Sequence, residues 1–533
     1  MNVLNMSFSD VFGNYTYTWT LAAIIVILSA IKKYLGRNDD YWKKQGIPFL
    51  PRPNYFYLLF ALGRKNICEF LKDITRLGRV VGSFEGSNPT VMVAEPDLLR
   101  DILVKDFHVF PYRRIMETGD PIADNMVSIM TGEDWKRVRT IITPAFTSKR
   151  MRQMGTIMNE CSKSVVEVCE KHCNEGKPVD FKSVFGAYTM DVIAKSAFAT
   201  EINSYNDPQN VFVRKVREGF LKFTIPRMLI AILLPGWILK HFQFLNPMKF
   251  DRDNFFRDVT MSVIKQRRET GQRYNDFLQL MMDAADETAQ TVNSEYAEDE
   301  TDRFGSITNN GLTPSTKYKK LSEVELLAQC IIFFMVGYET TATLLTFVCY
   351  CLATNPEWQE KLIKEVDEAF DKHKEMSYEA VRDMKILDAM VSETLRIHPP
   401  STSTERTAVE DYELGNTGIT IKKGMRVSIP AYAMHFDPEF FHHPQTFNPE
   451  RFMEGYQPKH PQYAYLPFGA GPRNCLGMRF ALLEVKMCLA NLLRHFKLKT
   501  HSTTKVPLQY SPGMVLLTVK ELPLSVEKRT LVI

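Results

Sequence analysis

Neither charge nor cysteine usage is strongly biased in this sequence of 533 residues. Lysine and arginine number 66, and aspartate and glutamate number 62, so the net charge is only +4, and no nucleic-acid partner is expected. The nine cysteines are scattered and odd in number, and no CxxC pair occurs. We therefore expect neither a disulfide framework nor a zinc site, and this usage is typical of a reducing compartment.

A dinucleotide-binding motif is also missing. No GxGxxG follows a segment with the pattern of a strand, which is the context in which that motif binds a flavin or nicotinamide dinucleotide. If the chain carries out redox chemistry, its electrons must come from another protein.

The first 17 residues contain no lysine or arginine, and an apolar run follows, Thr18–Ile31. Lys32 and Lys33 come directly after this run. Because positive charge marks the cytosolic side of a membrane span, we expect the N-terminus outside and the rest of the chain in the cytosol. A cleaved signal peptide is the alternative, but such a peptide carries its positive charge before the apolar run. The expected segments are a lumenal N-terminus at 1–11, a transmembrane anchor at 12–35, a proline-rich hinge at 36–54 and the main domain at 55–533.

Helical periodicity dominates the main domain. It extends from about Glu95 to Met282 and returns in a long apolar stretch, Leu321–Ala353. Val80–Val93 and Ser401–Val427 instead have short β-type stretches bounded by turn residues. The polar, acidic segment 283–320 is expected to be a surface loop. The sequence therefore predicts a mainly α fold with small β-sheets.

The apolar segment between Thr224 and Phe250 is interrupted by Pro226 and Pro235 and allows two interpretations. It is either a buried pair of helices or a second surface that dips into the membrane interface. The sequence leaves both interpretations open.

Cys475 has the most informative surroundings in the chain. It lies in the loop 468–477, FGAGPRNCLG, directly before an expected helix, Met478–Phe496. Free amides and the positive end of a helix dipole lower the pKa of a cysteine thiol, which favours a metal-binding thiolate. Arg473 offers a planar cation to a carboxylate, and Phe468 offers an aromatic wall against water. These features fit an iron porphyrin with sulfur on the metal; the alternative is a buried free cysteine.

An acid and two hydroxyls interrupt the long apolar helix at VGYETT, residues 336–341. A charged residue inside a buried helix is costly and needs a reason. Gly337 weakens the helix locally, and Thr340 can hydrogen-bond to a preceding carbonyl. In the resulting groove, Glu339 and Thr340 would relay protons to dioxygen. The alternative is a solvent-facing glutamate with a back-bonded threonine.

Together these segments make the chain resemble the cytochrome P450 monooxygenases. The spacing Phe-x-x-Gly-x-Arg-x-Cys-x-Gly is complete around Cys475, and VGYETT is similar to the oxygen-binding helix motif of the family, with Val336 where alanine is usual. Four segments resemble the branch that includes the vertebrate liver drug-oxidising enzymes: Phe110–Arg114, Glu133–Arg139, Pro144–Ser148 and Phe333–Thr340.

The resemblance implies a cytochrome P450 fold with an N-terminal anchor, and it assigns roles to further residues. Trp135 and Arg139 are one helical turn apart, so both could reach a single haem propionate. The residues expected to bind haem b are Arg113, Trp135, Arg139, Arg406, Phe468, Arg473 and Cys475, with Cys475 on the iron. The residues expected to line the substrate pocket are Ser128, Ile129, Phe334, Val336, Ser401, Thr402 and Met514.

Glu393 and Arg396 lie at positions i and i+3 of an expected helix. An exposed ion pair at this spacing is worth under ~1 kcal/mol. By the resemblance, the two residues would instead join Arg451, from the segment Phe447–Phe452, in a buried charge triad that holds the loop on the haem side. This role is expected to be architectural.

The implied reaction inserts one oxygen atom of O2 into a lipophilic substrate of the xenobiotic, steroid or fatty-acid class. Cys475 would donate electron density that favours O–O cleavage. Two alternatives are a haem-thiolate isomerase or dehydratase that acts on peroxides, which the pair Glu339 and Thr340 disfavours, and a non-catalytic haem sensor.

Because the chain has no dinucleotide-binding motif, the resemblance implies partner proteins that supply the electrons. Electrons would come from NADPH through a diflavin reductase, with cytochrome b5 as a second donor, at the cytosolic face of the endoplasmic reticulum membrane. The basic residues expected to dock the reductase near the thiolate are Lys136, Arg137, Lys149 and Arg479.

Overall fold

The computed structural model describes residues 8–52, 67–115, 118–207, 210–211, 213–215, 241–242, 255–286, 320–457, 459–512 and 516–530. Apart from 241–242, the segment 224–250 lies outside the described residues, so its two interpretations stay open. Most of the expected acidic loop, 287–319, also lies outside them.

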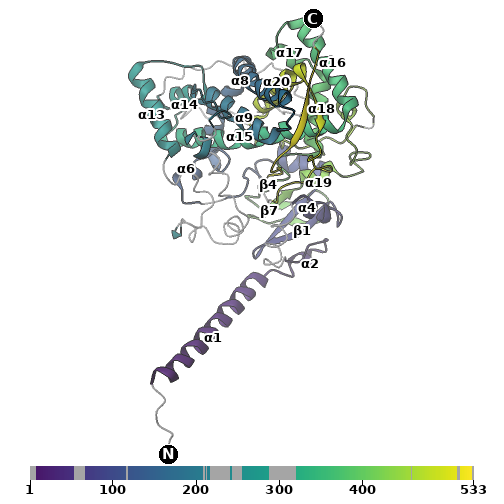
Figure 1. The fold of residues 1–533 in the computed structure, drawn as a ribbon. Coiled ribbons are helices and arrows are strands. Elements are labelled where there is room, and N and C mark those ends of the chain that lie inside the picture. Colours follow the sequence, from purple (N-terminus) through teal and green to yellow (C-terminus); the bar gives the residue numbers. More distant parts are fainter. Residues whose placement is uncertain are drawn as a thin grey trace, which may run out of the picture.

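Four long helices make the centre of the body (Figure 1). They are α8 (Ser148–Asn174), α9 (Phe181–Phe198), α15 (Glu323–Thr354) and α20 (Met478–His495). α15 packs against α9 and α20, and α8 packs against α9 and α20. Apolar side chains from all four helices share the largest buried cluster.

The long apolar stretch is a single helix because both of its ends are well defined. Ser322 and Glu325 form a capping box at the start of α15, which satisfies two otherwise free amides. Pro356 begins the next helix directly after the cap residue Asn355. Among the described residues α15 is the one helix long and apolar enough to cross a membrane, but most of it is buried inside the protein. It is therefore a core helix.

Shorter helices surround this centre. On one side lie α13 (Phe255–Thr270) and α14 (Phe277–Ala285). On the other lie α16 (Pro356–His373), α17 (Tyr378–Arg382) and α18 (Lys385–Ile397). The remaining helical segments are α4 (Ile67–Thr75), α5 (Pro96–Arg100), the π-helix η1 (Asp101–Lys105), α6 (Pro121–Asp124), α7 (Gly132–Ile142), η2 (Thr143–Phe146), α19 (Ala431–His435) and η4 (Pro449–Phe452).

Three small sheets complete the described structure, as the mixed pattern predicts. The four-stranded sheet has the order β1-β2-β7-β4, built from Val80–Glu85, Asn88–Val93, Arg426–Ile429 and Thr404–Thr407. The three-stranded sheet has the order β3-β9-β8, built from Val179–Asp180, Pro523–Lys528 and Phe496–Thr500. The pair β5-β6 joins Tyr412–Glu413 to Thr420–Ile421.

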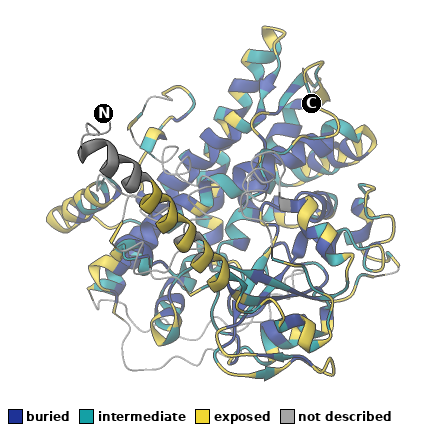
Figure 2. Cartoon of the chain, turned by 90° about the horizontal axis from the view of Figure 1, so that it is seen from below, coloured by how far each residue is buried: buried dark blue, intermediate teal, exposed yellow. Residues whose placement is uncertain are grey.

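The N-terminal helix α1 (Phe8–Gly36) projects from this body (Figure 1). Its described side chains are largely exposed, whereas the central helices are buried (Figure 2). The expected hinge is docked against the first sheet: α2 (Tyr41–Gln45) carries Trp42, which is fully buried and donates from Nε1 to the Ser83 carbonyl at 2.8 Å. Asn38, between α1 and α2, also donates to the Ser87 carbonyl at 2.7 Å, so the segment after α1 is held against the sheet.

Candidate functional site

The loop before α20 holds Cys475 in a fixed backbone turn. The Cys475 amide donates to the Phe468 carbonyl at 2.9 Å. Gly471 has φ +70, and a Cβ there would collide with the carbonyl oxygen of Leu103, so only glycine fits this close approach. Cys475 is the one exposed cysteine of the nine. The loop thus presents a single accessible sulfur.

The electrostatics of Cys475 differ from the expectation for the free thiol. The sulfur is accessible, but the protein groups around it shield it from bulk water and so raise its pKa; the Gly477 amide and the charges of Arg139 and Arg113 offset that rise only in part. The expected lowering of the pKa is therefore wrong for the thiol without a metal. A metal ion bound to the sulfur would itself remove the proton.

Four arginines surround this loop, and we call them the unpaired cluster: Arg113, Arg139, Arg406 and Arg473. Within the described parts of the chain, none of them forms an ion pair. The Nε groups of Arg113, Arg139 and Arg406 are buried with no hydrogen-bond partner. Three N–H donors therefore point at no acceptor in the part of the chain that the structure describes.

The remaining donors of the unpaired cluster fix its position through backbone carbonyls. Arg473 donates to the carbonyls of Pro111 at 3.0 Å and Met130 at 2.8 Å, and its guanidinium lies 3.8 Å from the ring centre of Trp135. Arg113 donates to the Arg473 carbonyl at 2.8 Å. The arginines thus hold one another and the loops around Cys475 in one arrangement.

Burial and mutual repulsion lower the pKa values of the arginines in this cluster. Burial, and after it the charges of Arg113, Arg406 and Arg139, lower the pKa of Arg473 to about 8. Burial likewise lowers the pKa of Arg406 to about 9 and that of Arg139 to about 10. Because an uncompensated buried cation is costly, the cluster favours an anion of at least two charges. The two propionates of haem b fit this requirement, and Cys475 fits its iron.

One face of the central helix α15, which carries Val336 and Thr340, is open, whereas the other faces are buried. Val336 is 50% exposed although the helix around it is mostly buried. Thr340 lies one turn later on the same face, and its hydroxyl donates to the Val336 carbonyl at 2.6 Å. α15 continues through Gly337 without a break. A Cβ on Gly337 would lie 2.6 Å from the Ile193 side chain, so this glycine lets α9 approach closely and does not break the helix.

Glu339 points to a different neighbourhood from Thr340. Its Oε1 accepts from Lys182 Nζ at 2.7 Å, from the Thr518 hydroxyl at 3.1 Å and from the Thr343 hydroxyl at 3.4 Å. Sequence reasoning missed Lys182 and Thr518, because each lies more than 150 positions from Glu339 and has no local signal. The acid is thus fixed by an ion pair across α9 and α15.

The expected substrate residues fall into different places. Ser128 and Ile129 lie in the turn between α6 and α7, which Gln329 of α15 holds by accepting from the Val127 amide at 3.0 Å. Ser401 is exposed and Thr402 is buried. Met514 lies outside the described residues.

Phe334 does not share the face of Val336. It is buried, and its ring centre lies 5.1 Å from that of Phe198 on α9. Two residues correspond to about 200° around a helix, so the two side chains point to opposite sides of α15.

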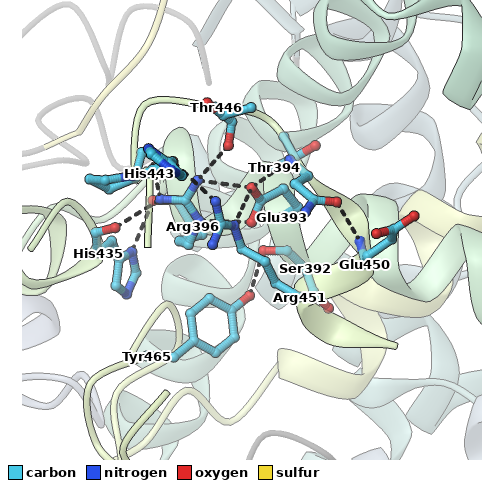
Figure 3. A network of polar contacts seen from close by, with 12 residues as sticks. Ser392, Glu393, Thr394, Arg396, His435, His443, Thr446, Glu450, Arg451 and Tyr465 are labelled. Carbon is cyan, nitrogen blue, oxygen red and sulfur yellow. Dashed lines mark hydrogen bonds and ion pairs between the residues drawn. The ribbon is translucent and has the colours of Figure 1, made fainter. Parts of the chain in front are cut away.

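A second group of buried charges, which we call the balanced cluster, consists of Glu393, Arg396 and Arg451 (Figure 3). Glu393 and Arg396 are fully buried and joined by two hydrogen bonds of 2.7 and 2.8 Å. Arg451 Nε lies 3.3 Å from the same carboxylate. Arg396 also donates to the carbonyls of His435 and Pro444. The cluster therefore ties α18 to the segment that leads to the Cys475 loop.

The basic residues expected to dock a reductase are mostly engaged. Lys136 pairs with Glu133, Arg137 pairs with Glu325, and Arg479 donates to the Ser148 hydroxyl. Lys149 is exposed.

Comparison with known proteins agrees with this chemistry. The family model described as Cytochrome P450 matches residues 47–526. Among the relatives, Cytochrome P450 3A5 from Homo sapiens is 36% identical and aligns over 96% of this chain and 97% of its own. Cytochrome P450 3A41 from Mus musculus is 34% identical over 97% of each chain, and Cytochrome P450 3A2 from Rattus norvegicus is 35% identical over 97% of each chain.

Proposed function

The chain belongs to the cytochrome P450 family, and we propose from this premise that it oxidises lipophilic molecules of the xenobiotic and steroid classes. As a member of this family it is a haem-thiolate monooxygenase that uses haem b, dioxygen and electrons from a reductase. The observation that carries the proposal is the unpaired cluster of arginines around the one exposed cysteine.

In this proposal Cys475 would ligate the iron, and Arg113, Arg139 and Arg406, whose buried Nε–H groups have no partner among the described residues, would bind the propionates. Arg473 keeps the surrounding loops in place and covers Trp135. Bound there, haem supplies an iron centre at which dioxygen is reduced with electrons delivered one at a time. Phe468 packs against the apolar core beside this loop and helps to exclude water.

Proton supply is assigned to α15. Thr340 holds its hydroxyl proton on the Val336 carbonyl, on the open face of the helix. Glu339 is the acid one residue before it, and Lys182 and Thr518 hold its carboxylate in place. We assign proton donation to Thr340, and its resupply to Glu339 when the Glu339 side chain turns from Lys182 towards the open face.

The test is Cys475→His with Cys173→Ser as the matched control. The histidine variant should retain part of its haem, and its ferrous carbon monoxide complex should lose the red-shifted Soret band of a thiolate ligand, while the control keeps it. An unchanged band in the histidine variant would exclude Cys475 as the ligand. In the same preparation with reductase and NADPH, Thr340→Ala should release more peroxide per NADPH than Thr340→Ser, and equal release would rule out the proton assignment.

We also propose that α1 anchors the enzyme in the endoplasmic reticulum membrane with the catalytic domain in the cytosol, where cytochrome b5 serves as a second electron donor. In support, Trp19, Leu21 and Ile25 are exposed on a helix that projects from the body (Figure 1), and Lys32 and Lys33 end its apolar run. Protease added to intact microsomes should remove the catalytic domain; a protected domain would reverse the topology.

A further inference from the structure

A small cavity lies behind the catalytic helix, between α9, α13 and α15. Phe334, Cys330 and Ile331 of α15 form one wall, and Ala194, Phe198 and Val259 contribute to the others. Because Phe334 points away from Val336, this cavity is on the opposite side of α15 from the open face. One helix layer, about 10 Å thick, separates it from the space over that face.

The lining is almost entirely hydrocarbon. Among the described residues that line it, none is charged, and the polar groups are two threonine hydroxyls and the thiol of Cys330. The Thr200 hydroxyl already donates to the Phe198 carbonyl at 3.2 Å. Burial raises the pKa of Cys330, so the thiol stays neutral. A water molecule needs two to four polar partners to remain in such a place, so the chemistry of the walls favours an apolar occupant.

The size of the cavity selects the class of occupant. Its volume is about 40 Å³, a few times the roughly 10–15 Å³ that one water requires and well below the ~150 Å³ of a cavity that takes benzene. An apolar molecule of two or three heavy atoms fits this volume. The reaction of this enzyme consumes one such molecule, dioxygen.

We propose that this cavity holds dioxygen close to the catalytic helix, one helix layer from the open face. The inference rests on the monooxygenase function and adds a binding site for dioxygen, the smaller of its two substrates. The close approach of α9 to α15 at Gly337 and Ile193 lies next to the cavity wall at Ala194, so motion of either helix changes the volume open to a gas molecule.

The direct test uses xenon as the probe, because it is apolar and close to dioxygen in size. Crystals of the haem-loaded enzyme under xenon pressure should show one anomalous peak in contact with Phe334 and Cys330. Ordered water in the cavity, or no peak there while other apolar cavities fill, would overturn the proposal.

The functional test fills the cavity from α9. Ala194→Val adds two methyl groups at the cavity wall, and Ala197→Val is its matched control, since Ala197 is buried on α9 in the same apolar cluster without lining the cavity. Ala194→Val should raise KM for dioxygen roughly two- to fivefold, equivalent to about 0.4–1 kcal/mol, and leave the spectral Kd of the organic substrate unchanged.

Cys330→Leu fills the same cavity from α15 and guards against a folding defect in Ala194→Val. Folded, haem-loaded variants with an unchanged KM for dioxygen would overturn the proposal. Loss of thiolate ligation in Cys475→His, by contrast, tests only the underlying function, so the two failures are distinguishable.

Discussion

Two groups of arginines are buried in the same fold and meet opposite surroundings. In the balanced cluster, Arg396 and Arg451 share the carboxylate of Glu393. In the unpaired cluster, Arg113, Arg139, Arg406 and Arg473 have no carboxylate partner in the described part of the chain. A buried charge without a partner of opposite charge destabilises the folded protein. The first cluster is completed by the chain itself, whereas in the proposal above the second is completed by the two propionates of haem.

The largest effect is expected where the chain supplies its own anion. Glu393→Ala leaves two buried guanidinium groups without their carboxylate, which should cost about 3–5 kcal/mol of the free energy of unfolding, a large part of what a domain has. The loss should be equal with and without haem, because no ligand takes part in this cluster. Denaturant unfolding of both forms measures it.

Glu360→Ala is the control for this experiment. Glu360 forms an exposed ion pair with Lys497, and such a pair contributes about 0–1 kcal/mol. A Glu393→Ala protein as stable as the control would mean that water reaches the balanced cluster.

Removing a charge from the unpaired cluster should not destabilise the protein without haem, in contrast to the change in the balanced cluster. Arg406→Met removes a fully buried, uncompensated charge, so the protein without haem should be as stable as the wild type or more stable. With haem, the same change removes a charged hydrogen bond worth about 1.5–3 kcal/mol, so haem loss to excess apomyoglobin should become roughly 10- to 100-fold faster. An equal loss of stability in both forms would place the partner of Arg406 inside the chain.

The difference between the clusters shows how far the sequence alone reaches. The spacing of Glu393 and Arg396 along one helix predicts their pairing. It gives no sign that the pair is fully buried or that Arg451, 58 positions from Glu393, completes it; both came from the resemblance. Burial depends on which surfaces meet, and a short window of sequence does not contain that information.

Strong local patterns did predict elements and their ends. The apolar stretch 321–353 is α15, Glu323–Thr354, because a capping box and a following proline define its limits. The direction of each side chain around that helix is not contained in the same pattern. Phe334 and Val336 were both expected in the substrate pocket, yet the structure directs them to opposite sides. Residues two positions apart on one helix face different surroundings, so they need not serve one site.

Acid should weaken the balanced cluster through His435. Its carbonyl accepts from Arg396, its Nε2 accepts from the Leu466 amide at 3.0 Å, and its Nδ1 lies 3.1 Å from the Arg396 carbonyl. Burial first, and then the charge of Arg396, lower the pKa of His435 to about 3. If Nε2 were protonated, its N–H would face the N–H of the Leu466 amide, and two donors would then meet without an acceptor. The folded protein therefore keeps this ring neutral.

The sign of the pH dependence follows from proton binding. The unfolded histidine takes up a proton below its ordinary pKa of about 6.5, and the folded one does so only near 3, so stability falls as pH drops through this window. At about 1.4 kcal/mol per pH unit, His435 should account for roughly 2 kcal/mol lost between pH 6.5 and 5. Unfolding of wild type and His435→Gln at pH 7, 6 and 5 measures it; equal slopes would assign the acid sensitivity to other groups, such as His398.

The smallest effect concerns the link between the unpaired cluster and its exposed neighbours. Residues 112–114 run beside β4, where the Thr407 amide donates to the Tyr112 carbonyl at 2.8 Å and the Thr407 hydroxyl donates to the Arg113 carbonyl at 2.9 Å. Successive side chains of an extended segment point to opposite sides. Arg113 therefore faces Cys475, whereas Arg114 pairs on the outside with Glu85 and Glu405.

Arg114→Met should therefore act on haem retention through Arg113. The pair is about a quarter exposed, so solvent screening limits its contribution to under ~1 kcal/mol, and haem loss should become only about two- to fivefold faster. Added salt should shrink the difference, because exposed pairs are screened. The decisive comparison introduces Arg114→Met into a protein that already carries Arg113→Met. There, Arg114→Met should have no further effect on the rate of haem loss. An unchanged effect there would show that Arg114 stabilises the sheet without positioning the arginine that meets the ligand.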